Sequence, residues 1–225
     1  MIIDGKEVIY SIKNKKVVYP EIPTEGLVCY LDARGKYNTD VYRNTLLDLS
    51  GNGNHGTLQN FNFTEESGYV KGLSGGTSGL RFDGVDDYLE YSHNLEETDP
   101  RTIFIDVEIE QTATEQGVSI TLPFGLIIHN ANNYIHNMDL GAHFNAGVNS
   151  MVKGTHKFVI TTESTVETGK MYYKGQVYAN NPQTSIGSYH FDPRRTYGLG
   201  KKTLTRAMLY NRALTDEEMQ QLMEV

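Results

Sequence analysis

The stretch LDLSGNGNHGTL at residues 47–58 decides the fold. Its glycines and asparagines accept backbone conformations with positive φ more readily than other residues, so the chain can reverse sharply before it enters a strand. A second stretch, LYNRALTDEE at 209–218, runs from an apolar strand into a helix start. There, Thr215 and Glu218 have the spacing of a capping box, in which each side chain bonds the backbone N–H of the other residue. Together the two stretches predict a turn-rich β domain that closes with a short helix.

The composition fits one soluble β domain. The chain has 225 residues, of which 38% are hydrophobic and 21% charged, so it can bury one substantial core. Its 22 glycines and 15 tyrosines are typical of short strands joined by tight turns. With a net charge of -8 and no basic stripe, nucleic acid is not expected as a partner. No run approaches ~18 apolar residues, so no membrane insertion is expected.

Short β-prone runs recur along the chain with Gly, Asn or Asp between them, which indicates a sandwich or barrel rather than a βαβ fold. The expected strands are Gly26–Leu31, Leu80–Phe82, Tyr88–Tyr91, Thr102–Glu110, Ser119–Leu122, Gly125–His129, Lys157–Thr162, Lys170–Tyr173, Gln176–Tyr178 and Ala207–Tyr210. After the capping box, Met219, Leu222 and Met223 form one apolar helix face. We therefore expect an all-β, two-sheet antiparallel sandwich with one short C-terminal helix.

The first 22 residues differ from the rest. Two β-prone runs, Glu7–Ile12 and Lys16–Tyr19, flank a turn at Asn14, which predicts an N-terminal β-hairpin. An isolated hairpin is marginally stable in water, so it should pack on the main domain or on a partner. The sequence thus predicts a docking hairpin at 1–22 and a main domain at 23–225.

Four segments, in order, resemble the concanavalin A-like, laminin G-like jelly-roll superfamily. They are GLVCYLD at 26–32, DLSGNGNHGTL at 48–58, LRFDGVDDYL at 80–89 and RAMLYNRALT at 206–215. A weaker fifth match joins 154–160 to 171–177, and the chain has no tryptophan where the family commonly has one. The resemblance implies a jelly roll that binds surfaces or glycans. It does not decide between lectins, hydrolases, adhesion modules and viral proteins, which share this fold.

The N-terminal segment resembles the start of tail and baseplate proteins from phages of Gram-positive bacteria. The alternative is that it is simply the first hairpin of the jelly roll. The opening residues MIIDGKE do not form a signal peptide, because no cationic segment precedes an apolar stretch. A virion protein assembled in the host cytoplasm would reconcile this with a glycan-binding fold.

Two groups of residues are candidates for chemistry other than glycan binding. Asp48, Asn52 and Asn54 offer closely spaced oxygen ligands for a structural calcium ion; the alternative is that they cap the turn through backbone hydrogen bonds. Asp106, Glu108 and Glu110 share one strand face, opposite core-facing Ile105, Val107 and Ile109, as carboxylates of a glycosidase would. The alternative is a solvated acidic face, and we expect no enzymatic activity and no other cofactor.

Single histidines and the cysteine carry little chemistry. His129, His136 and His143 recur every seven residues, but the loop-like sequence between them does not predict a zinc site. Cys29 is the only cysteine, so no intrachain disulfide forms, and its apolar surroundings predict a buried, inert thiol.

A glycan site combines aromatic faces with polar side chains on loops. The candidates of this type are Asn132, Tyr134, His136, Tyr189 and Tyr197, although these tyrosines could instead fill the sandwich or its rim.

The sequence therefore favours a non-enzymatic phage virion component. Its hairpin would contact other virion proteins, and its jelly roll would project outward, as one copy of a homo-oligomer, to bind host-surface carbohydrate. The alternatives are a structural or decoration protein without a ligand, a cell-surface or secreted lectin module, and a glycoside hydrolase.

Overall fold

The structure is a computed structural model of residues 1–225. It describes backbone and side chains for residues 22–72, 78–95, 99–110, 120–128, 153–163, 169–179 and 200–225. Outside these ranges it describes seven short strands by backbone alone: β1 (Ile2–Ile3), β2 (Lys6–Glu7), β3 (Ser11–Lys13), β4 (Lys16–Val18), β14 (Tyr134–Asn137), β15 (Ala142–Asn145) and β19 (Arg195–Tyr197).

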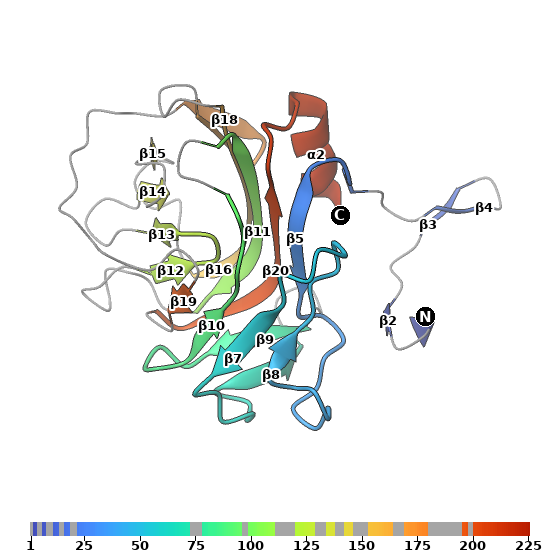
Figure 1. The fold of residues 1–225 in the computed structure, drawn as a ribbon, viewed down its shortest axis with the longest axis vertical. Helices are drawn as coiled ribbons and strands as arrows, with labels where there is room; N and C mark the ends of the chain where they lie inside the picture. Colours follow the sequence, from blue (N-terminus) through green and yellow to red (C-terminus); the bar gives the residue numbers. More distant parts are fainter. Residues whose placement is uncertain are drawn as a thin grey trace.

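One large antiparallel sheet forms the centre of the molecule (Figure 1). Its order is β18 (Gln176–Ala179), β17 (Lys170–Tyr173), β16 (Gly154–Thr162), β11 (Arg101–Ile109), β20 (Lys202–Tyr210), β9 (Ser78–Phe82) and β8 (Gly68–Lys71), and β5 (Leu27–Asp32) also pairs with β20. The long central strands β11, β16 and β20 are buried on both faces, which accounts for their nearly continuous runs of buried residues.

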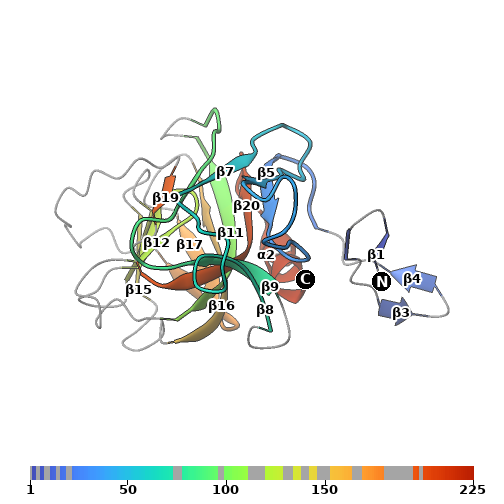
Figure 2. The same cartoon turned by 90° about the horizontal axis from the view of Figure 1, so that it is seen from below.

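Two smaller antiparallel sheets make the second layer. The first has the order β19, β10 (Tyr88–Glu90), β7 (Gly56–Gln59) and β6 (Thr45–Leu46). The second has the order β12 (Ile120–Leu122), β13 (Leu126–Ile128), β14 and β15. Figures 1 and 2 show these strands on one side of the large sheet and the helix α2 (Asp216–Glu224) on the other. The predicted all-β antiparallel sandwich with one short C-terminal helix is confirmed.

The main core lies between the two layers. Ile103, Ile105, Val107 and Ile109 of β11 all point into it, alternating with residues of the opposite face, as the sequence predicts. A smaller apolar cluster on the other face holds α2, where Met219 and Leu222 pack against residues that include Phe104, Val159 and Met208. Both faces of the large sheet are therefore covered at its centre.

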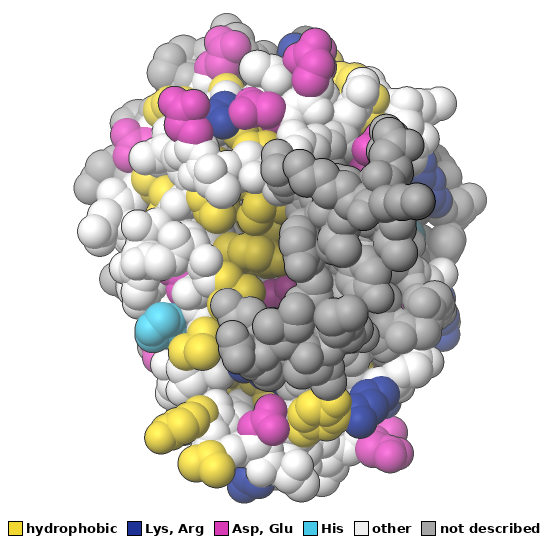
Figure 3. All heavy atoms as spheres, turned by 90° about the vertical axis from the view of Figure 1, so that its right-hand side faces the viewer, with side chains coloured by type: hydrophobic (Ala, Val, Ile, Leu, Met, Phe, Trp, Pro, Cys, Tyr) yellow, Lys and Arg dark blue, Asp and Glu magenta, His cyan; other side chains and the backbone are white. Residues whose placement is uncertain are grey.

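The helix α2 begins as the capping box predicts. The Thr215 hydroxyl accepts a hydrogen bond from the Glu218 N–H at 3.3 Å, and the Glu218 carboxylate accepts one from the Thr215 N–H at 2.9 Å. Arg212 also donates to Glu218, and this hydrogen bond is the main reason why the pKa of Glu218 falls to about 2. Figure 3 shows acidic side chains gathered at the upper end of the molecule, where α2 lies. Within the described residues, no helix is long and apolar enough to cross a membrane.

The N-terminal strands pair with one another. β1 pairs with β2, and β3 pairs with β4 so that Lys13 lies opposite Lys16, which leaves a two-residue connection at 14–15. The division of the chain at residue 22 and the docking role of the first segment stay predictions.

The strand β20 changes its pairing partner part-way along its length. β20 pairs with β5 through Arg206–Tyr210 and with β9 through Lys202–Leu204. Beyond Asp32 the chain leaves the sheet, and the Ala33 N–H donates to the Thr205 carbonyl at 3.0 Å. The loop that follows, residues 33–44, lies beside β8, and a cavity opens between this loop and the sheet.

Candidate functional site

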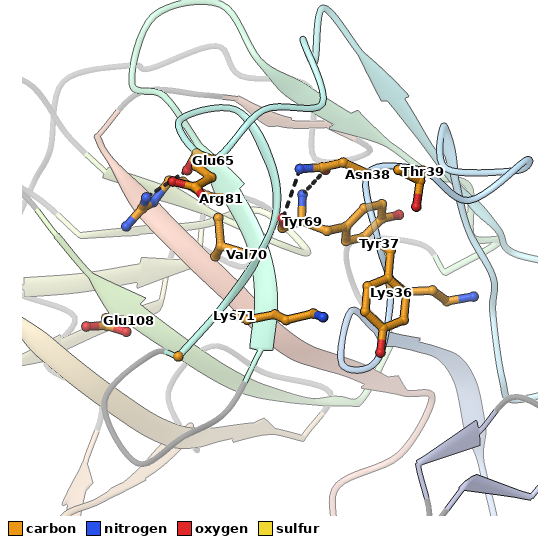
Figure 4. A pocket seen from close by; sticks show the side chains of 11 residues that line it. Lys36, Tyr37, Asn38, Thr39, Glu65, Tyr69, Val70, Lys71, Arg81 and Glu108 are labelled. Carbon is orange, nitrogen blue, oxygen red and sulfur yellow. Dashed lines mark hydrogen bonds between the residues drawn. The ribbon is translucent and has the colours of Figure 1, made fainter.

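The cavity has a volume of about 560 Å³ (Figure 4). Loop residues form one wall, and residues of β8, β9 and β11 form the floor and the opposite wall. The lining residues are Lys36, Tyr37, Asn38, Thr39, Glu65, Tyr69, Val70, Lys71, Gly72, Arg81 and Glu108. A cavity of this size, with several polar groups and an aromatic ring, suits a small polar ligand.

Asn38 fixes the loop to the sheet edge. Its side-chain oxygen accepts a hydrogen bond from the Tyr69 N–H at 2.7 Å, and its Nδ2 donates to the Tyr69 carbonyl at 3.1 Å (Figure 4). The amide therefore bonds the edge strand β8 as a neighbouring strand would. Gly68 makes room for this contact, because it has a φ of +147° and a Cβ there would lie 2.5 Å from Asn38 Oδ1.

Replacing Asn38 by alanine is expected to lower the free energy of unfolding by about 2 kcal/mol, because two backbone groups of Tyr69 lose their partner. Asn38→Asp keeps the acceptor and loses the donor, so its cost should be intermediate. Chemical denaturation measures both variants. Equal stability of Asn38→Ala and the wild type would contradict the role of Asn38 as the clamp of the loop.

Further hydrogen bonds hold the loop in one shape. The Tyr37 N–H donates to the Asp40 carboxylate at 2.9 Å, and Arg43 donates to the Asn38 carbonyl at 2.9 Å. This geometry leaves the Tyr37 side chain 39% exposed at the cavity wall, whereas Val41 and Tyr42, at 87% and 80%, do not line the cavity. A rigid, partly exposed ring is suited to stacking against a ligand, because little conformational freedom is lost on binding.

The charged groups of the cavity are unevenly placed. Lys71 Nζ lies 4.1 Å from the centroid of the Tyr37 ring. On the other side, Arg81 forms an ion pair with Glu110 at 2.9 Å and donates to the Glu65 carbonyl at 2.7 Å. Figure 4 shows Lys71 pointing toward Tyr37, with Glu65 and Glu108 on the far side of the group.

The three carboxylates of the predicted acidic face have different surroundings. Asp106 is only 5% exposed and bonds Arg206 at 2.8 Å, and Glu110 bonds both Arg81 and Thr203. The expectation of a solvated acidic face is therefore wrong, because arginines from β9 and β20 neutralise two of its members. Glu108 alone of the three lines the cavity.

The predicted calcium residues lie in the turn before β7. Asp48 accepts hydrogen bonds from three backbone N–H groups and from the Ser50 hydroxyl. The side-chain amides of Asn52 and Asn54 donate to the Val28 carbonyl at 3.0 and 2.9 Å. All three side chains thus hold the turn against β5, and calcium binding there stays a prediction.

Cys29 lies beneath the same turn. It is fully buried, and burial, reinforced by the nearby Asp48 charge, raises the pKa of its thiol far above the ordinary value. The predicted burial of Cys29 is confirmed, and its lack of reactivity stays a prediction.

A second acidic group lies after β9. Carboxylate oxygens of Asp83, Asp86 and Asp87 come within 4.8 Å of one another. Asp87 is buried and accepts hydrogen bonds from the Ser67 hydroxyl and the Asp83 N–H. Burial is the main reason why the pKa of Asp87 rises to about 6.

Lys202 is fully buried nearby, with Nζ 4.5 Å from the Phe82 ring centroid. Burial lowers the pKa of Lys202 to about 7, although the neighbouring Asp87 and Asp83 charges act in the opposite direction.

Lys202 should make stability depend on pH. Its folded pKa of about 7 lies below the ordinary 10.5, so the folded state is penalised increasingly as pH falls from 10.5 to 7. The free energy of unfolding of the wild type, relative to that of Lys202→Met, should therefore fall by about 1 kcal/mol for each unit by which the pH is lowered between 10.5 and 7. Denaturant unfolding at several pH values measures this slope. Lys201→Met, which removes a neighbouring surface charge, is the matched control, and a constant difference for Lys202→Met would contradict the prediction.

All five predicted glycan residues lie where side chains are not described. Asn132 and Tyr189 fall outside the described residues, as does His129 of the histidine series. Tyr134 and His136 fall in β14, and Tyr197 falls in β19 directly opposite Tyr88. His136 also lies directly opposite His143 of β15, so the seven-residue spacing corresponds to a cross-strand pair.

Apart from Glu108, sequence reasoning missed the residues that line the cavity. Tyr37 and Asn38 are neighbours in the sequence, but Lys71 belongs to a segment far from them, and no local pattern joins the two segments. The contact between Asn38 and Tyr69 spans 31 residues, and only the folded sheet brings these segments together.

No protein-family model matches the chain, and no curated protein matches it. Among solved structures, botulinum neurotoxin type C, studied for its interaction with two ganglioside molecules, gives a TM-score of 0.56 at 12% identity over 89% of this chain and 51% of that chain. The binding domain of botulinum neurotoxin serotype D gives 0.54 at 11% identity, over 89% and 52%. A Trypanosoma rangeli sialidase mutant with trans-sialidase activity gives 0.51 at 16% identity, over 90% and 34%. The chain thus spans 34% to 52% of these proteins, and identities this low show a shared β-sandwich fold alone.

Proposed function

We propose that this protein is a non-enzymatic carbohydrate-binding domain whose site is the cavity beside β8. The observation that carries the proposal is the Tyr37 ring, held at the cavity wall by a hydrogen-bonded loop and surrounded by polar side chains. Saccharides bind to such sites because an aromatic face covers their C–H groups while polar side chains bond their hydroxyls. Asn38 is occupied by the clamp, so Thr39, Glu65 and Glu108 supply these polar contacts.

One of the structural matches supports this choice of ligand. Both neurotoxin structures share the fold at TM-scores above 0.5, and one of them comes from work on ganglioside binding. Gangliosides carry saccharides, so a saccharide is the ligand class to test first on this chain.

The test is an array of immobilised glycans probed with the labelled full-length chain. We expect a defined subset of glycans to bind and soluble saccharide of the same type to compete. Absence of binding to every glycan, with a correctly folded chain, would contradict the proposal.

Glycoside hydrolysis is the second candidate. It is favoured by Glu65 and Glu108, two carboxylates that line one cavity, since hydrolysis commonly uses a carboxylate pair. Incubating the chain with the glycans that it binds distinguishes the two functions. Release of sugar by the wild type but not by Glu108→Gln would show that the protein is a glycoside hydrolase. Glycans that stay intact after long incubation would support a binding domain without hydrolytic activity.

We further propose a phage particle as the setting and the N-terminal segment as the docking element. The support is the resemblance of residues 1–22 to phage tail and baseplate proteins, together with the β3–β4 hairpin, which could add to a strand edge of a neighbouring subunit. The protein would then be located in the virion, where many copies would turn weak single contacts into avidity.

A pull-down tests this setting. The full-length chain and residues 23–225 are incubated with host cell walls and with particles that lack the protein. We expect both forms to bind walls and only the full-length chain to bind particles. Binding to particles alone would indicate a decoration protein without a ligand, and binding to walls alone would indicate a cell-surface or secreted lectin module.

A further inference from the structure

Two lysines give one end of the cavity a positive charge. Lys36 and Lys71 both line it, and neither forms an ion pair within the part of the chain that the structure describes. The segment that follows Gly72, residues 73–77, contains no acidic residue. In a chain with a net charge of -8, these two lysines give one end of the cavity a local positive potential that favours negative charge.

The other charged residues of the cavity are Arg81, Glu65 and Glu108, and they lie away from the lysines. Arg81 is neutralised by Glu110, with a second hydrogen bond from its Nε to the same carboxylate at 2.9 Å. Glu65 and Glu108 lie on the far side of the group from Lys71 and Tyr37 (Figure 4). The cavity therefore has a cationic end beside the aromatic ring and an acidic end opposite.

Lys71 is also held in place. Its ammonium lies over the Tyr37 ring at 4.1 Å, a cation–π contact that restricts an otherwise mobile side chain. A cation that is already positioned loses less conformational freedom when it binds an anion.

We propose that the ligand is an anionic saccharide. Its negatively charged group would bind at Lys71, its ring would pack on Tyr37, and its hydroxyls would donate to Glu65 or Glu108. Lys36, which extends away from Lys71 on the other side of the Tyr37 ring (Figure 4), would add to the positive potential without contacting the same group. This inference rests on the proposed carbohydrate-binding function and adds the charge of the ligand to it. A sugar carboxylate and a sugar sulfate offer the same chemistry to Lys71.

The experiment uses sets of related glycans whose members carry or lack a negative charge. Lactose, 3′-sialyllactose and 3′-sulfolactose form one set, and oligogalacturonate and its methyl ester form another. Affinities of the full-length chain are measured at low and at physiological salt. We expect the anionic member of at least one set to bind about tenfold more tightly than its neutral partner, with a difference that shrinks as salt rises. Comparing the affinities for 3′-sialyllactose and 3′-sulfolactose shows whether the chain prefers a carboxylate or a sulfate.

Variants of the lysines complete the test. Lys71→Met should weaken binding of the anionic glycan by about tenfold and leave the neutral partner unchanged, and Lys36→Met should have a smaller effect in the same direction. Lys71→Arg should retain binding, and Lys201→Met, which lies outside the cavity, is the matched control.

The outcomes separate the two proposals. Equal binding of charged and neutral partners, or unchanged binding in both methionine variants, would overturn the anionic ligand and leave carbohydrate binding standing. Absence of binding to every member of both sets and to a broad glycan array would overturn both proposals together.

Discussion

Replacing Asp48 by alanine is expected to lower the free energy of unfolding by about 3 kcal/mol and the melting temperature by roughly 10 °C. The carboxylate accepts hydrogen bonds from the backbone N–H groups of Tyr30, Ser50 and Asn54 at 2.8 to 2.9 Å. Alanine leaves these three donors without their acceptor and loosens the turn against β5. Calorimetry of the two proteins measures the effect.

The pH dependence of this effect gives a second readout. Burial raises the pKa of Asp48, but its hydrogen bonds with Tyr30, Ser50 and Asn54 lower it by more, so the pKa lies below the ordinary 3.8. The stabilisation by Asp48 is complete above that ordinary value and is lost as pH falls through the lower folded pKa. The difference between wild type and Asp48→Ala should therefore shrink in strong acid. Asp86→Ala, which removes an exposed aspartate, is the control. An equal loss of stability in Asp48→Ala and Asp86→Ala would contradict the account.

Replacing Tyr37 by alanine is expected to weaken saccharide binding by about thirtyfold, which corresponds to about 2 kcal/mol. The ring forms part of the cavity wall, while the hydrogen bonds of Tyr37 to Asp40 come from its backbone and survive the change. The melting temperature should therefore stay within a few degrees of wild type. Titration calorimetry with a glycan selected on the array measures the affinity.

Tyr42 provides the matched control. It lies on the same loop and is 80% exposed, but it does not line the cavity. Tyr42→Ala should bind as the wild type does, and Tyr37→Phe should retain stacking. If Tyr37→Ala bound normally while Tyr42→Ala did not, the binding surface would be the tip of the loop and not the cavity.

The fold could be predicted wherever a local pattern determined the structure. The alternation of Ile105, Val107 and Ile109 identified the core face of β11, and Thr215 with Glu218 identified the start of α2. The strand β20 was predicted to begin at Ala207, yet it begins at Lys202. Lys202 and Thr203 are polar but fully buried: the Thr203 hydroxyl donates to Glu110, whereas the charges of Asp87 and Asp83 offset the burial of Lys202 only in part.

The candidate site could not be predicted in the same way. β8 is four residues long and begins at Gly68, so its sequence carries little strand signal. Tyr37 lies in an irregular loop, and its position beside Lys71 depends on the bond between Asn38 and Tyr69. Acidic side chains on β11 were visible in the sequence, but the arginines that neutralise Asp106 and Glu110 come from other strands.

The central claim is that saccharide binds in the cavity beside β8, and mapping the bound ligand tests it most directly. Hydrogen–deuterium exchange of the full-length chain, with and without a glycan that it binds, reports which backbone segments become protected. The account predicts protection at residues 36–39 and 68–72, which line the cavity. Protection confined to residues 130–145 or 185–197 would contradict it and would direct attention to Tyr134, His136 and Tyr197 instead.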